Sequence, residues 1–185
     1  LWLHAVSVGE ANLAVQLVEE LRKEFGDWRY VVSTTTTTGM GVLRSKLPDS
    51  ARAIYYPIDW LPFVKSAFRT LKPSAIVLVE AEIWPNLFWE ANRTKAPLSL
   101  VNARLSEKSF EGYCRFGFLF RPLFKSLKAV GVHNAIDADR VASLGSAHEI
   151  IHVVGNMKFD GASVLGKSEL DASALLAQLR VPKDA

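Results

Sequence analysis

Acidic side chains occur directly after two apolar runs of the sequence, where they could take part in catalysis. Glu10 follows the run Trp2–Val6 and the turn SVG, while the run Ala75–Glu80 ends in a carboxylate that is followed two residues later by Glu82. A carboxylate held against a cleft wall can accept the proton of a substrate hydroxyl. Two carboxylates with the same facing at one strand end are ordinarily avoided, because like charges repel. The pair therefore favours a functional role over a structural one.

The same acidic residues also have a structural explanation. Glu10 opens a segment of helical periodicity, and an acidic side chain in a first helical turn gains a few tenths to about 1 kcal/mol from the helix dipole. Glu82 precedes Pro85, and because proline suits the first turn of a helix, Glu82 could simply cap that helix. Taken alone, Glu10 is better explained as a helix-start acid, so the residues themselves leave both interpretations open.

The run STTTTTGMG supplies hydroxyl groups and a glycine at the start of another helix. Such a turn could hydrogen-bond a phosphate or a sugar at a helix N-terminus. It is not a Walker loop, because the pattern GxxxxGK[ST] is absent from the sequence. A capped turn of β-forming residues is the simpler explanation of Thr34–Thr38.

Short apolar, β-branched runs alternate with longer segments of helical periodicity, which is the pattern of parallel strands joined by crossover helices. We therefore predict an α/β fold, a Rossmann-like doubly wound parallel sheet of about seven strands. The predicted strands are Trp2–Val6, Tyr30–Ser33, Ala53–Tyr56, Ala75–Glu80, Leu98–Val101, Ala129–Val132 and Ile151–Val154. The predicted helices are Glu10–Lys23, Pro62–Leu71, Trp84–Arg93 and Asp137–Leu144.

Polar residues concentrate just after these strands, and the carboxyl ends of parallel strands meet at one edge of the sheet. Ligands of doubly wound sheets bind at that edge, near the point where the strand order switches. The candidate substrate-binding residues are Ser7, Gly9, Thr35, Thr36, Thr38, Gly39, Glu82, Trp84, Asn86, Asn102 and Arg104. Lys158 follows the last predicted strand, in the string GNMKFD.

The segment between Arg104 and Lys128 interleaves basic and aromatic residues. One interpretation is a long helix with an aromatic core face and a solvated basic face. The other is a surface that meets anionic lipid, with aromatic rings at the apolar boundary and cations on phosphates. Nucleic acid fits the charge but not the hydrophobicity, and we expect no nucleic-acid partner. The candidate lipid-contact residues are Arg115, Phe118, Arg121 and Lys125.

Composition excludes several classes of protein. The 185 residues are 49% hydrophobic and 22% charged, an ordinary globular balance, and the net charge of +3 is too small to imply nucleic acid. No run approaches the ~20 apolar residues of a membrane span. Cys114 is the single cysteine, and the histidines lack metal-ligand spacing, with His4 expected in the core. We expect neither a disulfide nor a metal site nor a cofactor.

Five strings occur in order along the chain: HAVSVGE, the TTTTTG run, EAEIWPN, LVNARLSEKS and GNMKFD. Together they resemble the amino-terminal domain of 3-deoxy-D-manno-octulosonic acid (Kdo) transferases. The resemblance implies a GT-B glycosyltransferase, in which two Rossmann-like domains face each other across a cleft. Residues 1–160 would form the acceptor-side domain, and residues 161–185 would form a linker and helix leading to a donor-binding domain. We expect the chain, which begins at Leu1, to be part of a longer polypeptide.

The resemblance further implies an inverting transfer of Kdo from CMP-Kdo to a hydroxyl of a lipid A precursor, in lipopolysaccharide biosynthesis at the cytoplasmic face of the inner membrane. CMP-Kdo would be held mostly by the second domain, so this chain alone would be inactive. Glu10 would be the base, while Glu80 or Glu82 and Lys158 would stabilise the transition state. Departures from the family strings, such as Ala81 and Met157, leave the carboxylates and the lysine intact.

A second class of function fits the same residues. A Rossmann-like module could hold an anionic lipid or a sugar phosphate without turnover, through the basic aromatic segment. A dinucleotide-binding dehydrogenase fits less well, because the first turn reads SVGEAN and lacks the glycine pattern of that class.

Overall fold

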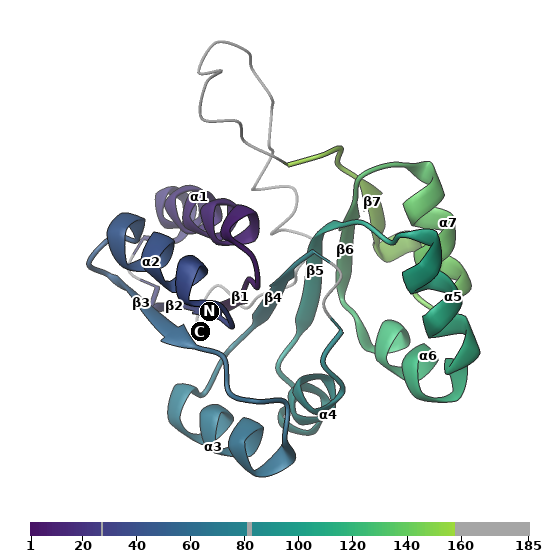
Figure 1. Cartoon of the computed structure of the whole chain (residues 1–185), viewed down its shortest axis with the longest axis horizontal. Helices are drawn as coiled ribbons and strands as arrows, with labels where there is room; N and C mark the ends of the chain where they lie inside the picture. Colours follow the sequence, from purple (N-terminus) through teal and green to yellow (C-terminus); the bar gives the residue numbers. More distant parts are fainter. Residues whose placement is uncertain (27, 81–82, 158–185) are drawn as a thin grey trace.

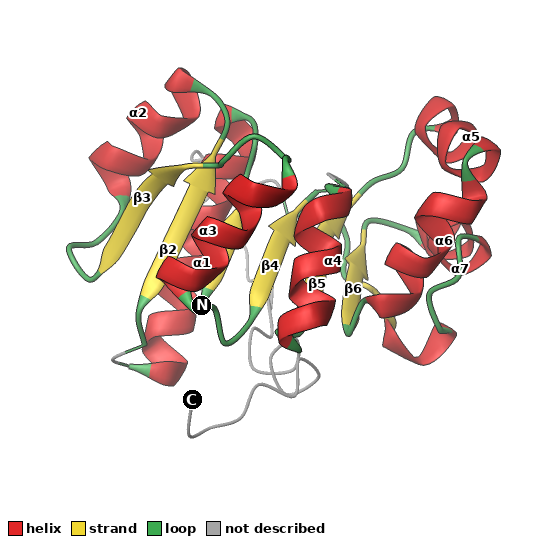
Figure 2. Cartoon of the chain, turned by 90° about the horizontal axis from the view of Figure 1, so that it is seen from below, coloured by secondary structure: helices red, strands yellow, loops and turns green. Residues whose placement is uncertain are grey.

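A seven-stranded parallel sheet forms the centre of the molecule, with strand order β3-β2-β1-β4-β5-β6-β7. The computed structural model describes residues 1–26, 28–80 and 83–157. Figure 2 shows neighbouring strands running in the same direction, so their carboxyl ends share one edge. The strands are β1 (Trp2–His4), β2 (Tyr30–Thr34), β3 (Ala51–Tyr55), β4 (Ile76–Val79), β5 (Leu98–Ala103), β6 (Ala129–Val132) and β7 (Ile151–Val153).

Helices cover both faces of the sheet. In Figure 1, α1 and α2 lie on one side of the sheet and α3 and α4 on the other. Side chains of α6 and α7 belong to the same apolar cluster as those of α3 and α4. The helices are α1 (Val8–Phe25), α2 (Thr37–Lys46), α3 (Leu61–Leu71), α4 (Pro85–Thr94), α5 (Glu107–Arg115), α6 (Gly117–Ser126) and α7 (Ala135–Ser143), with a 3₁₀ turn, η1 (His148–Ile150), before β7.

Helix α1 shows how the sequence determines these elements. Leu13, Leu17 and Leu21 recur at helical spacing, and all three are buried against the sheet. The helix ends at Gly26, whose positive φ of 55° suits glycine and whose N–H bonds the carbonyl oxygen of Arg22. Burying one such leucine side chain contributes about 1.5–3 kcal/mol, so the apolar stripe fixes α1 to its face.

The predicted elements are confirmed in type and order. Each of the seven predicted strands and each of the four predicted helices overlaps an observed element of the same type. The interpretation of 104–128 as one long helix was wrong. The chain forms α5 and α6, which are separated at Phe116. Gly112 and Gly117 are weak helix formers on either side of the break, so interrupting a helix here costs little.

No helix within residues 1–26, 28–80 and 83–157 is long and apolar enough to cross a bilayer. The predicted linker and helix at 161–185 lie outside the described residues, as do Glu82 and Lys158.

Candidate active site

The strand order reverses between β1 and β4. From the centre of the sheet, β1, β2 and β3 follow one another toward one edge strand, and β4, β5, β6 and β7 follow one another toward the opposite edge strand. At the centre, β1 and β4 are paired in parallel, with Leu3 opposite Val77. Glu10 lies in the first turn of the helix after β1, and Glu80 immediately follows β4. The two candidate carboxylates therefore follow the two strands of the switch point, where doubly wound folds bind their ligands.

Glu10 is held in place by its own helix start. The hydroxyl oxygen of Ser7 accepts a hydrogen bond from the Glu10 backbone N–H at 3.2 Å, and Glu10 Oε2 accepts one from the backbone N–H of Val6 at 2.7 Å. This exchange is close to a capping box, which satisfies N–H groups that a helix start leaves free. The Glu10 side chain is 6% exposed, and its Oε1 accepts no bond from another described residue. The backbone of Val6 therefore fixes Oε2.

The threonine run joins the loop after β2 to the loop after β1. The hydroxyls of Thr34 and Thr36 both donate to the Val6 carbonyl oxygen, at 3.1 and 3.0 Å, and Thr36 Oγ1 accepts the N–H of Gly39 as the N-cap of α2. A Cβ at Gly39 would lie 2.5 Å from Thr34 Oγ1, so only glycine fits there. These residues shape the loop, whereas Thr35 and Thr38 are exposed at the edge.

Glu80 adopts an unusual backbone conformation. Its φ is 62°, in the left-handed region, and its N–H donates to the carbonyl oxygen of Val101 on the neighbouring strand at 2.8 Å. Such a φ costs a non-glycine residue of the order of 1 kcal/mol or more, and such residues cluster at functional sites. The side chain is half-buried. The choice between Glu80 and Glu82 stays open, because Glu82 lies outside the described residues.

Asn102 ties three strand ends together. It is 1% exposed, and its Oδ1 accepts hydrogen bonds from His133 Nε2 at 2.7 Å and from the Met157 N–H at 2.9 Å. Its φ of 55° is one that asparagine tolerates better than most residues. The side-chain oxygen of Asn102 thus holds the GNM segment at the edge of the sheet, which is a positioning role. Arg104, a predicted substrate contact on the same loop, is exposed.

An aromatic cluster lies beneath this edge. The ring of His4 lies 4.2 Å from that of Tyr56 and 6.2 Å from that of Trp84, measured between centroids. His4 Nδ1 lies 2.9 Å from Ser33 Oγ and 3.2 Å from the Ser33 carbonyl oxygen. Burial lowers the pKa of His4 to about 4 despite the hydrogen bond to the Ser33 backbone, so this histidine is neutral near pH 7. His4 is a core residue, as predicted.

Asp59 is a residue that sequence reasoning missed. Its carboxylate accepts hydrogen bonds from the Asn86 and Leu87 backbone N–H groups, at 3.1 and 3.2 Å, and from the Tyr56 hydroxyl at 3.1 Å. It therefore caps α4 from another loop, since the N-cap residue Trp84 makes no side-chain cap bond. The Asn86 side-chain amide also donates to Asp59, which gives this predicted substrate contact a structural partner. The local sequence around α4 could not predict this cap, because Asp59 lies 27 residues before Asn86 in the chain.

Replacing Asp59 by alanine is expected to lower the free energy of unfolding by about 2 kcal/mol, because two N–H groups at the start of α4 and one buried hydroxyl lose their acceptor. Asp59→Asn, which keeps an acceptor, should cost less. Asp49 is exposed and provides the matched control, with an expected change of about 0.5 kcal/mol or less for Asp49→Ala. Urea unfolding measures the difference, and equal stability of the two alanine variants would refute the capping role.

The predicted lipid-contact residues lie on α5 and α6 and are exposed, with Phe118 at 83% exposure. Other rings of the same segment face the core: Phe124 is fully buried, and Tyr113 and Phe120 pack together at 4.7 Å between ring centroids. The segment therefore has an aromatic core side and an exposed side with charges of both signs, where Glu107 and Glu111 accompany the basic residues and Phe116 and Phe118 are also exposed. Within residues 1–26, 28–80 and 83–157, no three His, Cys, Asp or Glu side chains gather as they would around a metal ion.

Comparisons with known proteins agree with this architecture. The family described as "3-Deoxy-D-manno-octulosonic-acid transferase (kdotransferase)" matches residues 1–161. A 3-deoxy-D-manno-octulosonic acid transferase of Rickettsia bellii is 35% identical over 159 residues, which are 86% of this chain and 37% of that protein. The corresponding protein of Chlamydia trachomatis serovar D is 33% identical, over 85% of this chain and 37% of its own length. A "Bifunctional glycosyltransferase/methyltransferase" of Fusobacterium nucleatum is 32% identical, over 86% of this chain and 25% of that protein.

Solved structures with the same fold are more distant in sequence. The S. aureus "MnaA-UDP co-structure" superposes with a TM-score of 0.61 at 17% identity, over 93% of this chain and 50% of that one. A UDP-N-acetylglucosamine 2-epimerase superposes with a TM-score of 0.60, also at 17% identity, over 92% of this chain and 51% of that one. These likenesses concern the fold alone.

The switch point between β1 and β4, with carboxylates after both strands, and the structural neighbours define a Rossmann-like domain of the GT-B type. The sequence match over residues 1–161 is more specific. The chain belongs to the Kdo transferase family, and it spans about a third of the length of the curated transferases it matches.

Proposed function

We propose that this chain is the acceptor-side domain of an inverting glycosyltransferase that moves Kdo from CMP-Kdo to a hydroxyl of a lipid A precursor. The observation that carries the proposal is the placement of Glu10 and Glu80 after the two strands of the switch point. Membership of the Kdo transferase family supplies the reaction class, glycosyl transfer in lipopolysaccharide biosynthesis. Donor, acceptor and stereochemistry are part of the proposal.

In this mechanism, Glu10 Oε1 accepts the proton of the acceptor hydroxyl while Oε2 stays bonded to the Val6 N–H. The deprotonated oxygen attacks the anomeric carbon of Kdo, the bond from that carbon to the CMP phosphate oxygen breaks, and CMP leaves with the electron pair. Positive charge develops on the sugar ring and negative charge on the departing phosphate. A carboxylate such as Glu80 stabilises the first. Lys158, which lies outside the described residues, is proposed to stabilise the second, with no metal required.

The remaining polar groups of the edge would bind the acceptor. The exposed hydroxyls of Ser7, Thr35 and Thr38 and the guanidinium of Arg104 face solvent at or beside this edge, and they suit the hydroxyls and phosphates of a glycolipid. CMP-Kdo would be held mainly by a second domain, and the exposed basic residues of α5 and α6 would lie near the cytoplasmic surface of the inner membrane. The chain alone is then expected to be inactive.

The test is a transfer assay with purified protein. A complete transferase that contains this chain should convert CMP-Kdo and a lipid A precursor to a Kdo-bearing product with inverted anomeric configuration, followed by mass spectrometry and NMR. A matched donor with a different sugar on CMP should give no product. Absence of transfer by a folded complete protein that still binds the precursor would reject the enzyme and favour the second candidate, a non-catalytic module for anionic lipid. The exposed Phe118 and its basic neighbours are the observation behind that candidate.

A further inference from the structure

Two side chains of α7 hold the backbone of Leu105, in the loop that follows β5. Asp137 Oδ1 accepts the Leu105 N–H at 3.0 Å, and Arg140 Nη1 donates to the Leu105 carbonyl oxygen at 2.6 Å. We refer to these two contacts as the Leu105 clamp. The Leu105 side chain is 1% exposed and belongs to the apolar core. The N–H, the carbonyl group and the side chain of Leu105 are therefore all fixed, although β5 ends at Ala103.

Both side chains of the Leu105 clamp are themselves held in place. Asp137 lies in the first turn of α7, and its backbone N–H donates to Oδ1 of the N-cap residue Asn134 at 2.9 Å. It is buried, and a carboxylate is favoured at a helix N-terminus. The guanidinium carbon of Arg140 lies 5.9 Å from the centre of the Phe110 ring on α5, where the cation is attracted to the ring. The Leu105 clamp is therefore a rigid connection between α7 and the loop after β5.

The chain is also fixed on the other side of Arg104. The Ala103 carbonyl oxygen accepts the backbone N–H of His133 at 3.2 Å, and the register between β5 and β6 shifts between Leu100 and Ala103. Irregularities of this kind re-aim side chains and are frequent next to active sites. Ala103 and Leu105 are buried, whereas Arg104 between them is exposed. A firmly held backbone thus presents Arg104 to solvent.

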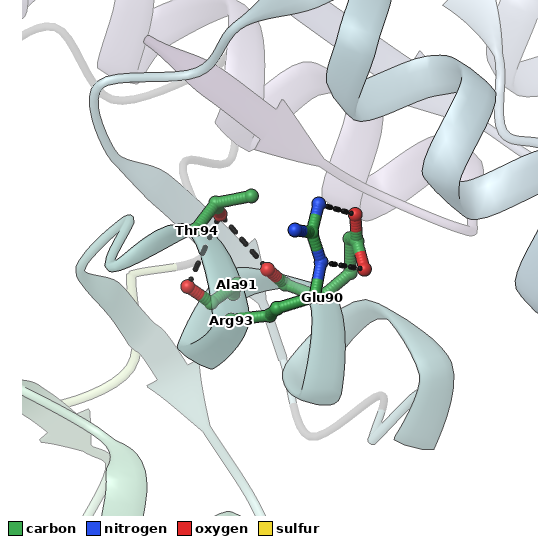
Figure 3. A network of polar contacts seen from close by, with 4 residues as sticks. All are labelled: Glu90, Ala91, Arg93 and Thr94. Carbon is green, nitrogen blue, oxygen red and sulfur yellow. Dashed lines mark hydrogen bonds and ion pairs between the residues drawn. The ribbon is translucent and has the colours of Figure 1, made fainter.

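The guanidinium of Arg104 forms no ion pair with another described residue. Arg93 on α4 shows the contrasting case, because Glu90 accepts two of its hydrogen bonds, at 2.6 and 2.9 Å, as Figure 3 shows. A phosphate group accepts the same paired hydrogen bonds from an arginine. Arg104 can therefore offer this paired geometry to an anion that arrives with a substrate.

Arg104 also lies beside a candidate catalytic carboxylate. The Glu80 N–H donates to the Val101 carbonyl oxygen at 2.8 Å, so Glu80 is next to the end of β5. Arg104 follows Val101 by three residues, and three residues of chain span at most about 10 Å. A substrate that reacts at this edge of the sheet would therefore pass close to Arg104.

We propose that Asp137 and Arg140 are positioning residues that act through Arg104, and that Arg104 binds a phosphate group of a substrate. Because the loop is fixed on both sides of Arg104, little conformational entropy is lost when the guanidinium binds the phosphate. Both substrates of the proposed reaction carry phosphate, the lipid A precursor and CMP-Kdo, and the test separates them. The inference rests on the proposed function, because it names residues that set the affinity for one of its substrates.

A double-variant cycle in a complete transferase that contains this chain tests the proposal. Arg104→Ala is expected to raise the KM for the phosphate-bearing substrate by about 10- to 100-fold, because charge-assisted hydrogen bonds are lost. Asp137→Ala should raise the same KM by about tenfold while Arg104 is present, because the guanidinium is misplaced. In the Arg104→Ala background it should raise this KM by less than about twofold, whereas a purely structural role would give losses that add.

Further variants make the test independent of the folding of Asp137→Ala. Arg140→Met removes the donor to the Leu105 carbonyl oxygen at a half-buried position, and it should repeat the same non-additive pattern. Asp137→Asn keeps an acceptor for the Leu105 N–H and should restore the KM to within about threefold of the unsubstituted protein. Asp139→Ala, at an exposed position of α7, is the matched control and should leave the KM unchanged. Circular dichroism verifies folding, and Arg140→Met decides the test if Asp137→Ala does not fold.

A dephosphorylated acceptor identifies which substrate Arg104 binds. If it is the acceptor, removing the phosphate should abolish the effects of the substitutions. If it is the donor, the effects should persist and appear in the KM for CMP-Kdo. Additive losses, or a KM that neither Asp137→Ala nor Arg140→Met changes, would overturn the inference while transfer by the unsubstituted protein upholds the proposed function. Absence of transfer by the unsubstituted protein would instead reject the proposed function, and equilibrium binding of the two substrates to the same variants would then decide on the Leu105 clamp.

Discussion

Glu10→Gln, in a complete transferase that contains this chain, is expected to lower kcat by about 10²- to 10⁴-fold, the usual contribution of a positioned general base. Glutamine preserves the shape of the side chain and its amide oxygen can still accept the Val6 N–H that bonds Oε2 at 2.7 Å. It also suits the third helical position of a capping box. What glutamine cannot do is take up the proton of an acceptor hydroxyl.

Two measurements separate this chemical role from a structural one. The free energy of unfolding of Glu10→Gln should stay within about 1 kcal/mol of the unsubstituted protein, because the helix start keeps its hydrogen bonds. Glu19→Gln, an exposed position on the same helix, is the matched control and should retain full transfer. Near-normal kcat for a folded Glu10→Gln enzyme would show that Glu10 serves only the start of α1.

The strands could be predicted because buried parallel strands are apolar along their whole length. Ile76–Val79 is buried at all four positions, and the sequence there is continuously apolar. Helix α1 could be predicted for the complementary reason, since it is buried on one stripe and its leucines recur at the helical period. The break at Phe116 could not, because the spacing of apolar side chains continues across it into α6, where Phe120 and Phe124 face the core.

The candidate site divides in the same way. The segments of the edge follow from strand ends, so Glu10, Glu80 and Asn102 could all be placed from sequence. The role of each side chain depends on partners that are distant in sequence: Asn102 Oδ1 bonds Met157, 55 residues away. The positive φ of Glu80 likewise has no signature in a glutamate, whose intrinsic preference is for negative φ. Sequence reasoning therefore identified the edge better than it assigned roles to residues on it.

The buried His4 should make the stability of the domain depend on pH. Its pKa is lowered to about 4 in the folded protein, first by desolvation, against 6.5 for an unperturbed histidine. Folding thus favours the neutral ring. The contribution to stability is fully present above pH 6.5 and is lost as the pH falls toward 4, because the unfolded chain takes up the proton first. The free energy of unfolding should fall by about 2 to 3 kcal/mol between pH 7 and pH 4.5 through this group.

Variants isolate this contribution from carboxylates that titrate over the same range. His4→Asn offers an amide N–H in place of Nδ1, and His4→Phe keeps a ring against Tyr56 and Trp84. Both should be less stable than the unsubstituted protein at pH 7, and in both the loss between pH 7 and 4.5 should be smaller by about 2 kcal/mol. His148→Asn, at an exposed position, should leave the pH dependence unchanged. Urea unfolding at each pH measures the free energy of unfolding of the unsubstituted protein and of the three variants. If this free energy fell equally with pH in all four proteins, His4 would be as easily protonated in the folded domain as in the unfolded chain.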